Sequence, residues 1–206
     1  MNYRVELAKF RQQKPALVRI AAVKETRILS NQDIERTLTR FAHQVIEPFD
    51  DPGGLVLVGI QTRGIHLARR LRDRIKSYFH LSLPVGLLDI TFYRDDFRSR
   101  RGMPTVQRTE IPFDVQEKNV VLVDDVLYTG RTARSGLEAI MSFGRPADIR
   151  FCCLIDRGHR ELPIQADIIG KTIPTHEHEE ISVHLTEEDG EDAVYVTQKE
   201  KEKKST

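Results

Sequence analysis

The stretch NVVLVDDVLYTGRTARSG, residues 119–136, indicates the fold of the whole chain. Its apolar run Val120–Val123 is rich in β-branched residues and too short for a helix, which predicts a buried strand. Two acids, Asp124 and Asp125, follow that run, and a turn containing Gly130 leads into a helical pattern. The stretch therefore predicts a strand that carries two carboxylates to the carboxyl edge of a parallel sheet.

The turn Thr129–Thr132 has the composition of a phosphate-binding loop. It precedes a helix N-terminus, where unpaired N–H groups and the helix dipole favour an anion. Asp124 and Asp125 would repel phosphate, but carboxylates accept hydrogen bonds from sugar hydroxyls. Together these residues indicate a phosphorylated ribose. Each residue alone would also suit an ordinary strand–turn–helix connection, and the stretch has neither a Gly-Lys-Ser/Thr nor a GxGxxG pattern.

A second strand–turn–helix unit comes earlier in the chain. Residues 55–60 are an apolar run, and Gln61–Gly64 form a polar turn with one positive charge. The amphipathic pattern after it predicts a helix whose inner face carries Ile65, Ala68, Leu71, Ile75 and Tyr78. This turn suits a second anion, although a routine connection has the same composition.

The remaining pattern alternates strands and helices. A helix is predicted from a cap at Ser30 to about Glu47, with a core stripe of Ile34, Leu38, Phe41 and Val45. The helix after Thr132 is predicted to bury Ala133, Leu137, Ile140 and Met141. Further strands are predicted at 84–91, 111–113, 148–155 and 166–169, with a hairpin of 181–185 and 193–197. This order predicts an α/β fold with a Rossmann-like parallel sheet and helices on both faces.

Composition sets broad limits on the class of protein. The chain has 206 residues, 39% of them hydrophobic, which fits one globular domain with a sizeable core. The net charge of +1 favours no class of partner. The two cysteines, Cys152 and Cys153, lie in a predicted core strand, so we expect a reduced, cytoplasmic setting. No apolar run has the length of a membrane span, and His176–Glu180 is interpreted as a solvated charge run.

Residues 119–136 resemble the phosphoribosyl pyrophosphate (PRPP) motif of the type I phosphoribosyltransferases. The chain further resembles one subfamily, the pyrimidine operon attenuation proteins that are also uracil phosphoribosyltransferases. That resemblance extends over about residues 27–185 and is carried by VGIQTRGIHLARRL, DITFYRDD, VVLVDDVLYTGRTARSG and IDRGHRELPIQADIIGK. It implies the type I phosphoribosyltransferase fold, with a small hood beside the parallel sheet.

The resemblance also implies a reaction, in which uracil and PRPP give UMP and pyrophosphate. Mg²⁺ would be held through PRPP and water, without a protein metal site. The implied catalytic residues are Asp124, Asp125 and Arg63, with the two acids on the ribose hydroxyls. Pyrophosphate would lie at Thr62 and Arg63, under Arg101 of an arginine-rich loop at 94–110. The other implied PRPP contacts are Val126, Leu127, Tyr128, Thr129, Gly130, Arg131 and Thr132, and the implied base contacts are Arg157 and Ile164.

The subfamily's second role is to bind a hairpin in pyrimidine operon (pyr) mRNA, with UMP as co-regulator. The matching positions here are Thr39, Arg40, His43, His159, Arg160 and Lys171. Pro48 and Gln165 stand where the subfamily usually has arginine. Because phosphate contacts dominate RNA affinity, these two changes would weaken RNA binding. The resemblance also implies a homodimer or a larger homo-oligomer.

We expect three segments along the chain: a poorly ordered extension at 1–26, a phosphoribosyltransferase domain at 27–198 with its hood at 156–166, and a disordered tail at 199–206. Two other functions remain open. One is an RNA-binding, nucleotide-sensing regulator with weak enzyme activity. The other is a phosphoribosyltransferase for another base, although the stretch DRGHRELPI matches the pyrimidine subfamily and argues against a purine.

Overall fold

The computed structural model describes residues 24–91 and 108–198. The segments expected at 1–23 and 199–206, and most of the arginine-rich loop with Arg101, lie outside these residues. The elements in chain order are β1 (Lys24–Ser30), α1 (Asn31–Ile46), η1 (Pro52–Gly54), β2 (Leu55–Ile60), α2 (Arg63–Phe79), β3 (Val85–Leu88), β4 (Asn119–Leu127), α3 (Arg131–Met141), β5 (Asp148–Asp156), β6 (Ile168–Thr172), β7 (Glu179–His184), α4 (Thr186–Asp189) and β8 (Ala193–Gln198).

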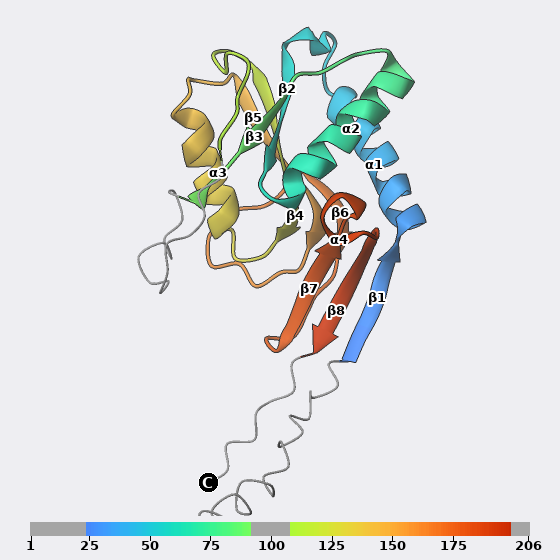
Figure 1. The fold of residues 1–206 in the computed structure, drawn as a ribbon. Helices are drawn as coiled ribbons and strands as arrows, with labels where there is room; N and C mark the ends of the chain where they lie inside the picture. The colour runs from blue at the N-terminus through green and yellow to red at the C-terminus, as the bar shows by residue number, and fades with distance from the viewer. Residues whose placement is uncertain (1–23, 92–107, 199–206) are drawn as a thin grey trace, which may run out of the picture.

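A five-stranded parallel sheet forms the centre of the molecule, in the order β3-β2-β4-β5-β6. Helices α1 and α2 cover one face of this sheet, and α3 covers the other (Figure 1). The predicted α/β fold is confirmed. Because parallel strands share a direction, the loops after β2, β4 and β5 leave from the same edge of the sheet, where ligands of such folds bind.

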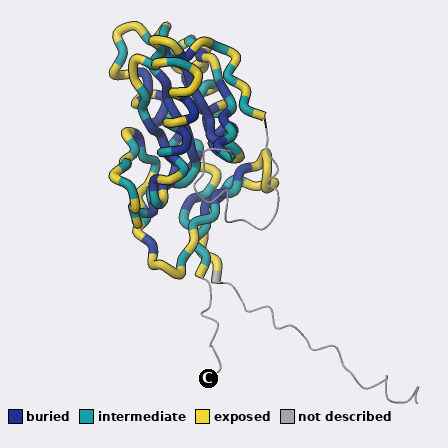
Figure 2. The backbone as a smooth tube through the Cα atoms, turned by 90° about the vertical axis from the view of Figure 1, so that its left-hand side faces the viewer, coloured by how far each residue is buried: buried dark blue, intermediate teal, exposed yellow. Residues whose placement is uncertain are grey.

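The central strand β4 is buried on both faces. Val121 and Val123 pack with the residues of α1 and α2, while Val120 and Leu122 pack with those of α3. Burial of each such side chain contributes about 1.5–3 kcal/mol, so this strand is a firm base for the acids at its end. Figure 2 shows buried backbone through the sheet and exposed backbone around it. The predicted α1 stripe is confirmed, because all four of its residues are buried.

A second, antiparallel sheet has the order β1-β8-β7 and lies at one end of the parallel sheet (Figure 1). The predicted hairpin is confirmed as β7 and β8. Strand β1 was not predicted, and its residues 24–26 belong to the expected extension. Within residues 25–30 of β1, whose burial is described, only Leu29 is buried, so this edge strand has no apolar alternation that a sequence could reveal.

Several predicted details were wrong. Tyr78 and Met141 were predicted inside, but they are 51% and 57% exposed. The Tyr78 ring lies beside the exposed His43 of α1 and not in the core. The strand predicted at 84–91 is only Val85–Leu88. Residues 111–113 form no strand, and a single bridge joins Glu110 to Leu87 instead. The strand predicted at 166–169 lies later, at Ile168–Thr172.

Two further features of the described part of the chain concern its helices and its cysteines. None of its helices combines the length and the apolar character that crossing a bilayer requires. Cys152 and Cys153 are buried free thiols of the central sheet. Burial raises the pKa of the Cys152 thiol well above its usual value, so this side chain stays neutral and acts as a small core residue.

Asp192 ties the β7–β8 connection to the rest of the fold. It accepts hydrogen bonds from Arg70 at 2.8 and 2.9 Å, and from the Thr186 N–H at 2.8 Å. Burial alone would raise the pKa of Asp192, but these donors outweigh burial and the pKa is lowered. A lowered carboxyl pKa adds stability above the unfolded-state value of about 4, and that stability disappears as pH falls through the folded-state pKa.

Asp192→Asn is therefore expected to reduce the free energy of unfolding at pH 7 by about 2 kcal/mol, since it removes the charge from a partly buried ion pair. The difference from the parent protein should shrink as pH falls below about 4, where the aspartate itself becomes protonated. Urea unfolding at both pH values measures this. An equal loss at both would show that the charge is not responsible.

Candidate functional site

The two acids lie at the carboxyl end of β4. Asp124 is 6% exposed and Asp125 is half-buried. The Asp125 N–H donates to Asp124 Oδ1 at 2.9 Å, and the Val126 N–H donates to Asp125 Oδ1 at 2.9 Å. These bonds fix both carboxyl groups against the backbone, so the acids have a defined orientation at the edge of the sheet.

The charge of Asp125 is held in a poorly solvated place. Burial raises its pKa, while the hydrogen bond with Asp124 and the positive charge of Arg63 lower it less strongly. A half-buried carboxylate of this kind gains from new hydrogen-bond donors, because burial has removed part of its water. Hydroxyl groups of a bound sugar would supply such donors.

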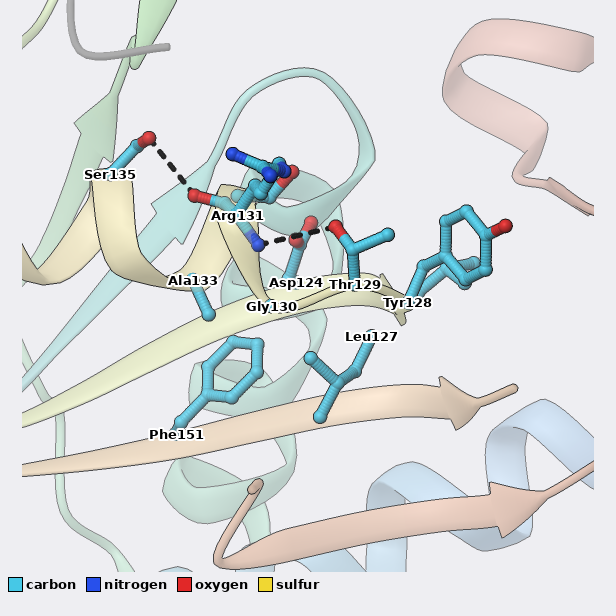
Figure 3. Close-up of a pocket in the computed structure, with 11 residues that line it drawn as sticks. Asp124, Leu127, Tyr128, Thr129, Gly130, Arg131, Ala133, Ser135 and Phe151 are labelled. Atoms are coloured by element: carbon cyan, nitrogen blue, oxygen red, sulfur yellow. Dashed lines mark hydrogen bonds between the residues drawn. The ribbon is translucent and has the colours of Figure 1, made fainter. Parts of the chain in front are cut away.

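The turn after β4 is shaped by Gly130. Its φ of 91° lies in the left-handed region, which glycine adopts without a side-chain clash. The helix α3 has no side-chain hydrogen bond at its N-cap, and the Arg131 N–H donates to Thr129 Oγ1 at 3.4 Å (Figure 3). The first N–H groups of a helix have no partner within the helix, so this terminus can bind an anion.

A cavity of about 460 Å³ opens at this turn. Figure 3 shows side chains from β4, the turn, α3 and β5 around it. Its lining contains seven of the predicted PRPP contacts and Asp124, together with three residues that were not predicted: Ala133, Ser135 and Phe151. The first two lie one turn into α3, directly after the motif, whereas Phe151 comes from β5 and no sequence signal links it to the turn. The lining residues are Asp124, Val126, Leu127, Tyr128, Thr129, Gly130, Arg131, Thr132, Ala133, Ser135 and Phe151.

The turn Gln61–Gly64, between β2 and α2, lies directly against β4. A Cβ atom on Gly64 would lie 2.4 Å from the Val123 carbonyl oxygen and 3.2 Å from Asp124 Cα. Only glycine allows this approach. The Gln61–Thr62 peptide bond is cis, and Thr62 makes no side-chain cap of α2. The two predicted anion turns, Gln61–Gly64 and Thr129–Thr132, therefore leave neighbouring strands, and the first of them touches the acid-bearing segment.

The Arg63 side chain has its own partner. Its Nε and Nη2 atoms donate to the two carboxylate oxygens of Asp189, at 3.1 and 2.7 Å. Because the guanidinium is engaged there, the backbone N–H groups at the start of α2 are the groups that remain for an anion at this turn. The residue Asp189 was not among the predicted site residues.

We call residues 156–166 the hood loop. This loop packs on the turn Thr129–Thr132, which we call the phosphate-type turn. The N–H groups of Glu161 and Leu162 both donate to the Thr129 carbonyl oxygen, at 3.0 and 3.1 Å. The Arg131 side chain pairs with Glu161 at 2.6 Å. A Cβ on Gly130 would lie 3.4 Å from Ile164 Cβ, so this predicted base contact lies beside the turn.

Arg157, the other predicted base contact, belongs to the hood loop itself and is 7% exposed. Its guanidinium lies 4.1 Å from the centre of the Tyr128 ring. It also donates to the Glu179 carbonyl oxygen at 2.6 Å and to Thr175 Oγ1 at 3.2 Å. These contacts give Arg157 a scaffolding position, and it is not among the residues that line the cavity.

The predicted RNA-contact residues form two groups. Arg40 on α1 donates to the carbonyl oxygens of Ile169 and Gly170 on β6, next to the exposed Lys171. Thr39 and His43 lie on the same helix, and the His43 ring packs against Phe79. The second group is in the hood loop: Arg160 holds Asp156 at 2.6 Å and the Tyr128 carbonyl oxygen at 2.7 Å, and His159 contacts the Thr175 carbonyl oxygen.

Comparison with known proteins decides the family. Residues 24–188 match the family described as phosphoribosyl transferase domain. The chain belongs to the phosphoribosyltransferase family. The family resemblance and the fold inferred from the sequence are both confirmed by this match.

Within this family, relatives that share about half of their residues with the chain are found. The bifunctional protein PyrR of Pelotomaculum thermopropionicum is 54% identical over 175 residues, which is 85% of this chain and 97% of the relative. The bifunctional protein PyrR of Halalkalibacterium halodurans is 51% identical over 84% of this chain and 97% of its own length. The chain therefore spans nearly the whole of these relatives.

Solved structures of phosphoribosyltransferases share the fold at much lower identity. A hypoxanthine-guanine phosphoribosyltransferase of Bacillus anthracis has a TM-score of 0.64 and 17% identity, over 86% of this chain and 98% of that chain. A hypoxanthine phosphoribosyl transferase of Trypanosoma cruzi has a TM-score of 0.66 and 15% identity, over 86% of this chain and 93% of that chain. At such identity the likeness concerns the architecture alone.

Proposed function

We propose that the protein transfers the phosphoribosyl group of PRPP to uracil, giving UMP and pyrophosphate. The observation that carries the proposal is the cavity at the end of β4, where the Asp124 carboxylate and a glycine-shaped helix N-terminus share one space. Membership of the phosphoribosyltransferase family supports the reaction type. The resemblance of IDRGHRELPIQADIIGK to the pyrimidine subfamily supports uracil as the base.

In this proposal the chain holds PRPP at three points. Asp124 and Asp125 accept hydrogen bonds from the ribose hydroxyls, and the N–H groups of Thr129–Thr132 bind the 5-phosphate. The backbone of Thr62 and Arg63 binds the pyrophosphate. We assign Mg²⁺ to PRPP and its waters, because Mg²⁺ prefers phosphate and water oxygens as ligands. Mg²⁺ would neutralise charge on the departing pyrophosphate.

The reaction exchanges one bond at the anomeric carbon for another. The bond to the pyrophosphate oxygen breaks and its electron pair leaves with pyrophosphate, while a uracil nitrogen bonds to the carbon and its proton passes to the departing pyrophosphate or to water. Positive charge develops on the ribose as this happens. The carboxylates of Asp124 and Asp125 lie where they would stabilise that charge, and their fixed orientation means that little reorganisation is needed.

We assign the base to the space under the hood loop, beside Ile164. The loop is tied to the phosphate-type turn by Glu161, Leu162 and Arg160, so base and phosphate would be held by one connected unit. Arg157 would act indirectly, because its guanidinium supports Tyr128 from a buried position. Uracil recognition by backbone groups of the loop fits this arrangement.

The test is pyrophosphate release from PRPP and Mg²⁺ with uracil, with hypoxanthine, and without a base. Release that depends on uracil is expected, with UMP as the second product. Release with hypoxanthine alone would show that the site takes another base. No release with any base, together with tight UMP binding, would favour a nucleotide-sensing regulator instead.

A second role, UMP-dependent binding of the pyr operon mRNA leader, is favoured by the likeness to the relatives named bifunctional protein PyrR and by one cluster on this chain. Arg40 and Lys171 lie together where α1 meets β6, with the hood-loop residues Arg160 and His159 at the adjoining end of β5. A gel shift with the leader RNA should show binding that UMP strengthens. Lys171→Ala should weaken it, since phosphate contacts supply most RNA affinity.

A further inference from the structure

A ladder of opposite charges joins α2 to the connection between β7 and β8. Three basic side chains at spacings of three and four residues lie on one face of α2, where they meet three consecutive acids of α4. These side-chain pairs link the two sheets, because α4 connects two strands of the antiparallel sheet and α2 packs on the parallel sheet. The pairs are Arg63–Asp189, His66–Glu188 and Arg70–Glu187.

One pair of this ladder includes Arg63, which belongs to the turn Gln61–Gly64 where we place the pyrophosphate. Arg63 and Asp189 form a two-bond pair, with side chains 31% and 20% exposed. The Leu185 N–H also donates to Asp189 Oδ2 at 2.9 Å, so the backbone of the hairpin fixes this carboxylate. A carboxylate that is fixed in this way presents a rigid target for the planar guanidinium.

A second acid competes for the same guanidinium. Arg63 and Asp125 interact electrostatically, and the Arg63 charge is one of the groups that lower the pKa of Asp125. Asp125 is less solvated than Asp189. Pairing with Arg63 would therefore offset the cost of burying the Asp125 charge. If Asp189 lost its charge, the attraction between Asp125 and Arg63 would remain.

We propose that Asp189 is a positioning residue, which holds the Arg63 guanidinium away from Asp125 and so keeps the ribose-binding carboxylate open to hydroxyl groups. This rests on the proposed function, because it assigns Asp125 to the ribose of PRPP. Asp189 acts through Arg63 and does not touch the substrate. Its loss would weaken PRPP binding, while the reaction of bound PRPP would change little.

The experiment compares Asp189→Asn with the parent protein in steady-state kinetics and in calorimetric titration with PRPP and Mg²⁺. Asparagine keeps the acceptor for the Leu185 N–H but removes the charge. The KM and Kd for PRPP are expected to rise about tenfold, the size of one lost charge-assisted interaction, with kcat changed less than about threefold. Asp189→Glu, which restores a carboxylate, should return KM to within about threefold of the parent value.

Two further variants separate positioning from a general loosening of the hairpin. Glu188→Gln removes the neighbouring rung, the 2.7 Å pair with His66, and should leave the KM for PRPP unchanged. In an Arg63→Gln background, Asp189→Asn should have no additional effect, because the guanidinium that it positions is gone. Thermal unfolding of each variant confirms that the fold is intact.

Each outcome is decisive. An unchanged or lowered KM in Asp189→Asn would overturn the proposal, and so would an equal rise in Glu188→Gln. A rise that persists in the Arg63→Gln background would show that Asp189 acts on something other than Arg63. If the parent protein turned over PRPP and uracil normally in those cases, only the positioning role would fail. If the parent protein bound no PRPP, the proposed function would fail with it.

Discussion

Asp125→Asn is expected to lower kcat/KM for PRPP about 100-fold while leaving the protein at least as stable at pH 7. The loss of activity follows because a neutral amide accepts weaker hydrogen bonds from the ribose than a carboxylate does. It also stabilises no positive charge at the anomeric carbon. A charge-assisted hydrogen bond contributes about 1.5–3 kcal/mol, and about 2.7 kcal/mol corresponds to 100-fold.

The substitution is expected to lower activity but not stability, because burial raises the pKa of Asp125. A carboxyl group whose folded-state pKa exceeds its unfolded-state value favours folding when protonated, and this advantage is lost as pH rises through the folded-state pKa. At pH 7 the charge therefore opposes folding, and the substitution removes it. The side-chain oxygen of the introduced amide can still accept from the Val126 N–H, as the aspartate does.

Steady-state kinetics and urea unfolding at pH 7 together measure both effects. Asp148→Asn is a matched control. Asp148 is an exposed acid at the start of β5, at the edge of the sheet away from the site, and it pairs with Arg150. It should change neither quantity appreciably. Full turnover in Asp125→Asn would contradict the assignment of this residue to the ribose.

Gly64→Ala is expected to reduce kcat/KM by about 100-fold, although alanine is the better helix former. Helix propensity alone would favour alanine by about 1 kcal/mol at this first turn of α2. The added Cβ, however, would meet the Val123 carbonyl oxygen at 2.4 Å, and a backbone group of the central strand cannot move aside. The turn must shift instead, and a shift of about 1 Å at a reacting centre can lower a rate about 100-fold.

Gly54→Ala provides the comparison for that variant. A Cβ on Gly54 has no neighbour closer than the Asn119 side chain at 3.9 Å, and the residue lies at the other end of β2. It should leave kcat/KM unchanged. Activity of Gly64→Ala near the parent value would show that the approach of this turn to β4 is not needed for the reaction.

The segment from β4 to α3 could be predicted from the sequence because every signal for it is local. The buried strand is a run of β-branched residues, the two acids end that run, and the helix shows its apolar period directly after the turn. The α1 stripe was predictable for the same reason. Tyr78 continued the period of α2, but the period of a helix does not show where its packing partners end, and Tyr78 is exposed.

Contacts between distant segments could not be predicted in this way. Phe151 lines the cavity because β5 pairs with β4 in a register that places it opposite Leu122, and register is a property of the folded sheet. The partner of Arg63 lies 126 residues further along the chain. Arg40 and Arg160 were recognised by resemblance as RNA contacts, but only the structure shows that both guanidiniums also bind backbone carbonyl oxygens.

The most direct test of the assigned site is the position of UMP in a crystal structure of its complex with the protein. We expect the 5-phosphate at the N–H groups of Thr129–Thr132, and the two ribose hydroxyls within hydrogen-bond distance of Asp124 and Asp125. The uracil ring should lie beneath the hood loop beside Ile164. Nucleotide bound elsewhere, with the turn after β4 empty, would contradict the account.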